Sequence, residues 1–184
     1  MSKVIIFEGP DNCGKSTQIK MLLKYLAYDP THVIHYSNIP GISNKRSMEY
    51  GKVLYGDMFK LITESFLSGR NLILDRAHLG EYVYSPIYRD YNGDYIFELE
   101  KQFMENIHRK HNIYLFLFVD EPENLVSRED GLSFSTELDK KTKEINLFKE
   151  AFNKSSIINK FPVNIHGVTA EQVHEFVKDV ITLP

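Results

Sequence analysis

The sequence has one cysteine, no tryptophan and no long run of apolar residues. A lone cysteine cannot close a disulfide within the chain, so we expect a reducing compartment, the cytoplasm. The longest apolar run, Ile113–Val119, is far shorter than the about 20 residues that a membrane helix needs. The N-terminus lacks the extended apolar stretch of a signal peptide. We therefore predict a soluble, intracellular protein that does not bind a membrane.

An excess of charge of one sign is also missing. The formal net charge is −3, from 22 basic and 25 acidic residues, which argues against a protein that coats nucleic acid but allows local clusters that bind small phosphates. The chain has 184 residues, with 42% hydrophobic and 26% charged, which suits one globular domain with its own core. We expect a single domain over residues 1–184, with a homodimer left open.

Short apolar runs alternate along the chain with longer stretches of helical period. The runs are continuously apolar, which is typical of parallel strands buried on both faces. Between them apolar residues recur at i, i+3, i+4 and i+7, and Thr169 with Gln172 forms a capping box before the last such stretch. This alternation predicts a doubly wound α/β sheet with right-handed crossovers. The expected strands are Val4–Phe7, His32–Tyr36, Asn71–Leu74, Ile113–Val119 and Phe161–Ile165.

A phosphate-binding loop follows the first expected strand. The sequence Gly-Pro-Asp-Asn-Cys-Gly-Lys-Ser-Thr at residues 9–17 fits G-x-x-x-x-G-K-[ST] between a strand and a helix, the context that this pattern requires. The backbone N–H groups of such a loop and the helix N-terminus surround phosphate oxygens. Lys15 should reach the β- and γ-phosphates, and the Ser16 hydroxyl should bind Mg²⁺. The expected contacts with a nucleoside triphosphate are Gly9, Asn12, Cys13, Gly14, Lys15, Ser16 and Thr17.

A second group of polar residues follows the third expected strand. Residues 72–75 are apolar and end in a carboxylate, the form of a Walker B element, so Asp75 is a candidate ligand of Mg²⁺ or of its water shell. Arg76 comes next, and its guanidinium suits bidentate phosphate binding. Residues 37–43 and 128–136 fit neither period and come after two other strands. They should lie at the same carboxyl edge of the sheet, where open parallel sheets bind ligands.

Several segments of the chain resemble thymidylate kinases. The most specific is Phe7–Gln18, which is similar to the family's phosphate loop, including the aspartate inside the loop and the trailing glutamine. Softer similarities cover Arg46–Leu54, Leu67–Arg76, Val119–Arg128 and Asn164–Val173. The likeness therefore runs along nearly the whole chain. The residue sequence from Asp75 to Tyr84 looks more like that of kinases encoded by large bacteriophages than that of cellular enzymes.

The resemblance implies a fold and a reaction. The fold would be that of the P-loop NTPases, with a five-stranded parallel sheet in the order 2-3-1-4-5. A lid would occupy about residues 128–136, and an acceptor-binding region about residues 37–67. The reaction would transfer the γ-phosphoryl group of ATP, with Mg²⁺, to a small-molecule deoxynucleoside monophosphate, first of all dTMP.

Carried over by position, the resemblance also implies roles for single residues. Asp11 would meet the deoxyribose 3′-hydroxyl, while Arg46 and Arg76 would hold the 5′-phosphate of the acceptor. Arg128 would come from the lid to the ATP phosphates, and His166 lies in the loop expected on the adenine side. The residues expected to act on the transferring group are Lys15, Asp75, Arg76 and Arg128.

Other polar residues carry a weaker signal. Glu81 and Tyr84 follow the third strand closely and are candidates for contact with the nucleoside. His78 is interpreted as a structural residue, because a histidine near a strand end is more often satisfied within the core. The lysines after the lid, at 140, 141 and 143, are interpreted as a solvated helix face.

Four features of the sequence bear on the choice between alternative functions and substrates. Asn12 stands where cellular thymidylate kinases that keep a loop arginine place it, and residues 46–75 contain no counterpart of their base-reading helix, so the base stays open. A nucleoside kinase would need a general base to deprotonate a hydroxyl, just after the second strand. Residues 35–40 contain no carboxylate, so we prefer a monophosphate acceptor. A guanine-binding switch is disfavoured, because residues 153–156 lack the aspartate of N-K-x-D.

Overall fold

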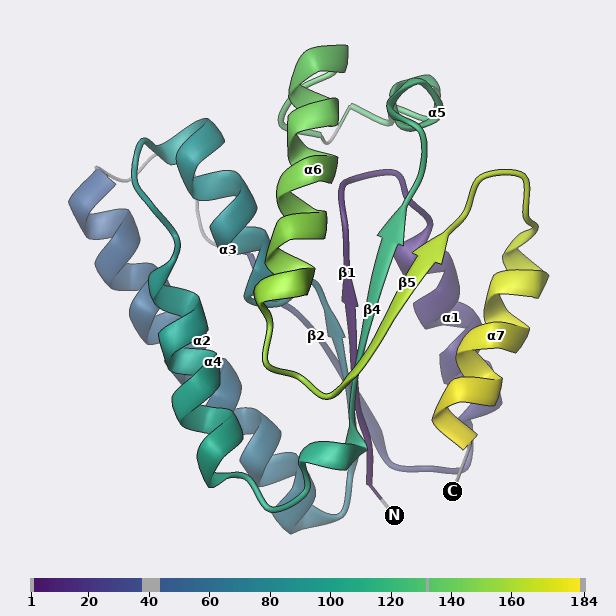
Figure 1. Ribbon diagram of the computed structural model, residues 1–184. Helices are drawn as coiled ribbons and strands as arrows, with labels where there is room; N and C mark the ends of the chain where they lie inside the picture. The colour runs from purple at the N-terminus through teal and green to yellow at the C-terminus, as the bar shows by residue number, and fades with distance from the viewer. Residues whose placement is uncertain (1, 38–43, 132, 183–184) are drawn as a thin grey trace.

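The computed structural model describes residues 2–37, 44–131 and 133–182. These residues form one parallel sheet with helices packed around it (Figure 1). The strand order is β2-β3-β1-β4-β5, and each neighbouring pair is parallel. This confirms the predicted order 2-3-1-4-5. The strands are β1 Val4–Glu8, β2 Thr31–His35, β3 Asn71–Asp75, β4 Ile113–Val119 and β5 Asn159–Asn164.

Helices cover both faces of the sheet and so divide the core into two clusters (Figure 1). On one face α1 and α7 pack over Ile5, Phe7 and Phe116. On the other face α2, α3, α4 and α6 pack over Val4 and Ile6. The helices are α1 Lys15–Tyr25, α2 Asn44–Ser68, α3 Leu79–Tyr84, α4 Tyr95–Asn106, α5 Pro122–Ser127, α6 Leu138–Lys154 and α7 Ala170–Thr182, with a π-helical turn at Ser85–Arg89 and a 3-10 turn at Lys110–Asn112.

The expected burial of the strands holds in the centre of the sheet and fails at its edges. All five residues of β1 are buried, as are six of the seven in β4. The edge strand β2 is largely exposed, with Val33 at 40%, and β5 has one buried residue, Val163. The prediction that every strand is buried on both faces was therefore wrong for β2 and β5, because an edge strand has a neighbour on one side only.

Local signals at the helix ends are confirmed. The Thr169 amide donates to Oε1 of Gln172 at 2.9 Å, and the Gln172 amide donates to the Thr169 hydroxyl at 3.3 Å. These reciprocal bonds form the predicted capping box at the start of α7. Across the described residues, no helix combines the length and apolar character needed to cross a bilayer.

The carboxyl ends of β1 and β3 bring the motif residues to one edge of the sheet. Phe7 pairs with Asp75 and Val33 pairs with Ile73 in the parallel register, so the phosphate loop and the end of β3 begin side by side. The segment 128–136 reaches this edge from β4 and α5. Of the other expected ligand loop, residues 38–43 lie outside the described residues.

Candidate active site

The phosphate loop has the backbone geometry that its glycines predicted. Gly9 has φ 136°, and a Cβ there would lie 2.2 Å from the Phe118 carbonyl oxygen on β4, so only glycine fits. Gly14 has φ 78°, and a Cβ there would meet nothing within 4 Å. The loop is therefore packed against the sheet on one side and leaves open space on the other, directly before α1 begins at Lys15. This is the cradle that a phosphate group needs.

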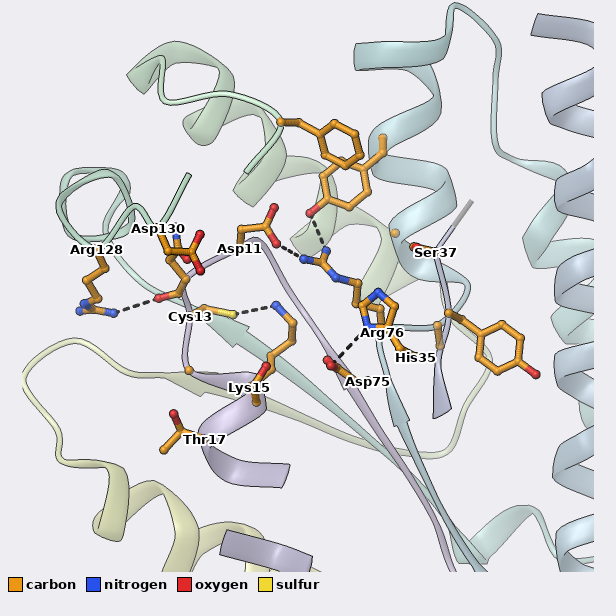
Figure 2. Close-up of a pocket in the computed structure, with 18 of the residues that line it drawn as sticks. Asp11, Cys13, Lys15, Thr17, His35, Ser37, Asp75, Arg76, Arg128 and Asp130 are labelled. Carbon is orange, nitrogen blue, oxygen red and sulfur yellow. Dashed lines mark hydrogen bonds and ion pairs between the residues drawn. The ribbon is translucent and has the colours of Figure 1, made fainter. Parts of the chain in front are cut away.

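Lys15 is held over the loop rather than extended into solvent. Lys15 is only 6% exposed. Its Nζ donates hydrogen bonds to the carbonyl oxygens of Gly9 at 2.9 Å and Pro10 at 2.6 Å. Cys13 is fully buried and lies 3.3 Å from the same ammonium (Figure 2). The Cys13 thiol also donates to the Pro10 carbonyl oxygen at 2.9 Å. The side chain of Cys13 therefore fills space inside the loop, and only its backbone could contact a ligand.

One cavity of about 670 Å³ joins the phosphate loop to the end of β3. Its volume suits a small-molecule substrate site. Residues 11–17 form one side of the cavity. The opposite side includes four residues that we call the β3 wall: Asp75, Arg76, Tyr84 and Arg89.

Arg76 lies between an acidic and an aromatic partner on the β3 wall. One guanidinium nitrogen pairs with Asp11 of the phosphate loop (Figure 2). The other donates to the Tyr84 hydroxyl at 3.2 Å, and the guanidinium carbon lies 5.9 Å from the centre of that ring. Burial raises the pKa of the Tyr84 hydroxyl well above its ordinary value, so Tyr84 stays neutral. Asp11 and Tyr84 thus hold the Arg76 guanidinium at the strand end, facing the cavity.

Arg89 is a second cation of the β3 wall, and the sequence analysis missed it. It is 8% exposed, and Nη1 donates to Oε2 of Glu81 at 2.6 Å. Glu81 is fully buried, and its other oxygen accepts hydrogen bonds from the hydroxyls of Tyr91 and Tyr95. Burial and the Glu81 charge raise the pKa of the Tyr95 hydroxyl, which therefore remains a donor. Two tyrosines thus hold the carboxylate that holds Arg89.

The prediction of direct contact between Glu81 and the nucleoside is corrected by this arrangement. Glu81 does not line the cavity, because Arg89 stands between its carboxylate and the open space. No local signal marks Arg89, because the π-helical turn Ser85–Arg89 decides where that side chain points. Tyr84, in contrast, does line the cavity.

Asp75 and Ser16 offer oxygen atoms to the same cavity. Asp75 is 3.2 Å from Nδ1 of His35, which ends β2 beside it (Figure 2). Among the described residues there is no cluster of three or more acidic, histidine or cysteine side chains that could hold a metal ion. Mg²⁺ ordinarily takes one or two protein ligands and completes its shell with water and substrate phosphates, so these two oxygens fit such an ion.

The lid is tied to the phosphate loop through Asn12 and Arg128. The Asn12 amide donates to Glu129 at 3.1 Å and to Ser133 at 3.3 Å. Arg128 donates to the Asn12 carbonyl oxygen at 3.4 Å and pairs with Asp120 at the end of β4. Asn12 therefore joins the phosphate loop to the segment that follows α5.

Asp120 anchors Arg128 as a carboxylate. Its burial would raise its pKa, but hydrogen bonds from Asn124, from the Glu121 amide and from Arg128 outweigh that effect and hold the pKa of Asp120 below its ordinary value. The side chain of Arg128 is 44% exposed and lines the cavity.

An aromatic contact closes the other end of the lid. Phe134 stacks on Tyr88, with ring centres 5.0 Å apart, and lies 5.3 Å from Tyr84. Tyr88 donates to Glu144, whose carboxylate lies 3.5 Å from Nζ of Lys141. Lys141 and Glu144 are both fully buried.

The prediction that Lys141 belongs to a solvated helix face was therefore wrong. Lys141 lies on the buried face of α6, four residues before Ile145 and seven before Phe148, whereas Lys143 is exposed and Lys140 is half-buried. Residues at these spacings share one face of a helix, so the position of Lys141 relative to the apolar stripe was the signal that separates it from the other two lysines.

Comparison with known proteins gives the arrangement a family context. No protein-family model matches the chain. The thymidylate kinase of Caldicellulosiruptor saccharolyticus is 29% identical over 203 residues, covering 97% of this chain and 95% of that protein. That of Rickettsia conorii is 25% identical over 198 residues, covering 96% and 95%. The chain is similar to thymidylate kinases.

A solved structure supports the fold independently. The thymidylate kinase of Ehrlichia chaffeensis superimposes with a TM-score of 0.70 at 16% identity, covering 98% of this chain and 99% of that one. The P-loop kinase fold expected from the sequence therefore agrees with the observed sheet order.

Two further candidates that the likeness to thymidylate kinases suggested, Arg46 and His166, do not line the main cavity. Arg46 is exposed in the first turn of α2 and does not line it. His166 is exposed after β5, with Nδ1 3.0 Å from the Asn124 amide nitrogen. Beside it a smaller cavity of about 310 Å³ includes Ile165 and Thr169 and continues from the phosphate loop. His166 does not line this cavity.

His78 lies outside the main cavity and is completely buried. Nε2 of its ring is 3.4 Å from Glu100 of α4, and the ring lies 5.3 Å from the Phe59 ring. These surroundings agree with the structural interpretation of His78.

Proposed function

We propose that this chain is an ATP-dependent nucleotide kinase that transfers the γ-phosphoryl group of ATP to a deoxynucleoside monophosphate, dTMP first of all. The observation that carries the proposal is the placing of two arginines, Arg76 and Arg89, opposite the phosphate loop in one cavity. An acceptor phosphate brought close to the ATP phosphates is repelled strongly where water is excluded. Fixed cations on the acceptor side offset that repulsion, and both arginines are held by carboxylates.

The phosphate loop would hold the donor. Lys15 would exchange its two carbonyl partners for the β- and γ-phosphate oxygens and stabilise the charge that develops during transfer. Arg128, anchored on Asp120, would approach the same phosphates from the lid. Ser16 and Asp75 would hold Mg²⁺, which neutralises charge on the phosphate oxygens when bound.

The β3 wall would hold the acceptor. Arg76 would grip the 5′-phosphate with its planar fork of donors. Arg89 would supply a second cation, and Glu81 would act through Arg89. Asp11 is proposed to accept a hydrogen bond from the 3′-hydroxyl of the acceptor. Its ion pair with Arg76 would orient the carboxylate for that contact. Tyr84 would lie beside the sugar.

A nucleoside acceptor is disfavoured by the same cavity. Transfer to a hydroxyl needs a general base within hydrogen-bond reach. The residues after β2 that line the cavity are Tyr36 and Ser37, neither of which is a carboxylate. Asp11 is a carboxylate that lines the cavity, and it is paired with Arg76.

A substrate screen tests the proposal. The purified chain is incubated with ATP, Mg²⁺ and each of the four deoxynucleoside monophosphates and four deoxynucleosides, and the products are measured by mass spectrometry. We expect dTMP to give the diphosphate with the highest kcat/KM. Ready phosphorylation of thymidine or deoxycytidine with little turnover of any monophosphate would overturn the nucleotide-kinase proposal.

Three further expectations are independent of the reaction. We propose a cytoplasmic location, which the buried, unpaired Cys13 supports. A homodimer is proposed and can be measured by size-exclusion chromatography with light scattering. The bacteriophage character of Asp75–Tyr84 stays a prediction.

A further inference from the structure

Glu8 ends β1 directly before the phosphate loop, and its side chain is turned away from that loop. The residue is fully buried. Its Oε1 accepts two backbone hydrogen bonds, from the Ala77 amide at 3.0 Å and from the Leu79 amide at 2.8 Å. Ala77 lies in the turn between β3 and α3, and Leu79 is the first residue of α3, so one carboxylate oxygen ties the end of β1 to the turn and to the start of that helix.

The turn held by Glu8 contains Arg76 in an unusual conformation. Arg76 has φ 64°, a left-handed conformation that residues other than glycine rarely adopt and that persists where the surroundings impose it. On one side of the turn the Arg76 amide donates to the Phe7 carbonyl oxygen at 2.9 Å. On the other side Glu8 holds Ala77 and Leu79. Two consecutive residues of β1 therefore fix the backbone that carries the Arg76 guanidinium.

We propose that Glu8 is a positioning residue that fixes Arg76 at a set distance from the phosphate loop. The main chain of Glu8 leads into Gly9, whose carbonyl oxygen accepts from Lys15, while its side chain holds the Arg76 turn. The donor and acceptor sides of the cavity are thus joined through one residue. This inference rests on the proposed kinase function, because it gives Arg76 the acceptor phosphate as its ligand.

The bond-accepting oxygen, rather than the negative charge, is the feature of Glu8 that the geometry uses. The titratable and charged groups that face Glu8 are His78 and Arg76 from the β3 side and Lys15 from the loop. Burial raises the pKa of Glu8 against the opposing effect of these groups. A glutamine side chain has the same length and offers a carbonyl oxygen at the same place. An aspartate keeps the carboxylate but is one carbon shorter.

Two variants separate geometry from charge. In Glu8→Gln we expect KM for dTMP within about threefold of the wild-type value, because both amide bonds can form. In Glu8→Asp we expect KM for dTMP to rise about tenfold or more, on the scale of lost buried hydrogen bonds, while KM for ATP stays within about twofold. A tenfold loss in Glu8→Gln, or an equal rise in both KM values in Glu8→Asp, would overturn the proposal.

A matched control comes from Glu100 on α4. It is 1% exposed and accepts hydrogen bonds from the Ser155 hydroxyl at 2.7 Å and the Ile157 amide at 3.0 Å, away from the cavity. Glu100→Asp makes the same change of length at a similarly buried site. Because Glu100 also lies 3.4 Å from Nε2 of His78, the residue between Ala77 and Leu79, we expect Glu100→Asp to lower stability and to raise KM for dTMP less than Glu8→Asp does. An equal rise in that KM would overturn the specific positioning role of Glu8.

Amide hydrogen exchange provides a readout that needs no turnover. In the wild-type protein and in Glu8→Gln the Ala77 and Leu79 amides should exchange slowly, and in Glu8→Asp they should exchange at least about tenfold faster. If the chain phosphorylates no monophosphate but this pattern is seen, the proposed function fails and the anchoring role stands. If Glu8→Asp does not fold, Glu8→Gln decides alone: a loss of protection at Ala77 and Leu79 contradicts the proposal, and retained protection with retained KM supports it.

Discussion

The phosphate loop and the β3 wall face each other across one cavity, but they are assembled differently along the chain. The loop is a continuous stretch of nine residues, 9–17, whose shape follows from its own glycines and from the helix that begins within it at Lys15. The β3 wall joins a strand end, a short helix and a π-helical turn. Its two arginines depend on carboxylates from elsewhere, Asp11 and Glu81. A site that binds phosphate through backbone is local in sequence, whereas a site that binds through paired side chains is not.

The largest effect is expected on the loop side. Lys15→Met removes the ammonium that would stabilise the transferring group, so kcat should fall about a hundredfold or more, as for other lost electrostatic stabilisers. Steady-state kinetics with saturating ATP and dTMP measures it. The melting temperature should change little, because the side chain is replaced by one of similar length. A folded variant with near-wild-type kcat would remove Lys15 from the mechanism.

The next largest effect is expected on the β3 wall. Arg76→Lys keeps the charge and loses the planar fork, so kcat/KM for dTMP should fall by about 2 kcal/mol, or thirtyfold. KM for ATP should barely change. Comparing KM for ATP with KM for dTMP tests whether the two sides of the cavity bind different substrates. An equal rise in both KM values would contradict that separation.

A third change tests whether Arg89 serves the wall or only the core. Arg89→Met leaves the buried Glu81 without its ion pair, which should cost about 3 kcal/mol of unfolding free energy and raise KM for dTMP. The double variant Arg89→Met with Glu81→Gln should recover most of the stability in urea denaturation but not the KM. Recovery of both would make Arg89 a purely structural residue.

A smaller effect is expected from Asp11, which belongs to the loop but pairs with the wall. Asp11→Ala should raise KM for dTMP about tenfold, the scale of a lost hydrogen bond to a charged group, and leave KM for ATP nearly unchanged. Isothermal titration with each nucleotide measures the two affinities. Equal losses would show that Asp11 supports the loop rather than the acceptor.

The smallest effect concerns the anchor of the lid. Because the pKa of Asp120 in the folded chain lies below its ordinary value of 3.8, the unfolded chain binds more protons in that range, and stability rises with pH there. The contribution of Asp120 should be present above about pH 4 and be lost as the pH falls through the folded-state pKa. Urea denaturation between pH 2 and pH 6 should show a shallower dependence in Asp120→Asn. An unchanged slope would contradict the anchoring of Arg128.

The central strands and the phosphate loop could be predicted because their signals are continuous in sequence, whereas the sheet order followed from the resemblance to thymidylate kinases. Val4–Phe7 is apolar and is followed by Gly9 and Lys15, and nothing distant is needed to interpret that order. The sequence also identified Asp75 and Arg76, since a strand end is a local feature. The burial of β2 was predicted wrongly, because whether a strand lies at an edge depends on which neighbours it has.

What the sequence by itself determined is the chemistry of the donor side: a backbone cradle and a lysine at the start of a helix, set by nine adjacent residues. On the proposed acceptor side the sequence identified Asp75, Arg76 and Tyr84, and the tertiary structure added Arg89, which lies in a π-helical turn and lines the cavity. The structure also placed the Glu81 carboxylate against Arg89 and buried Lys141 beside Glu144. These outcomes depend on burial and on charge pairing, because a buried ionic side chain is stable only where a partner meets it in space.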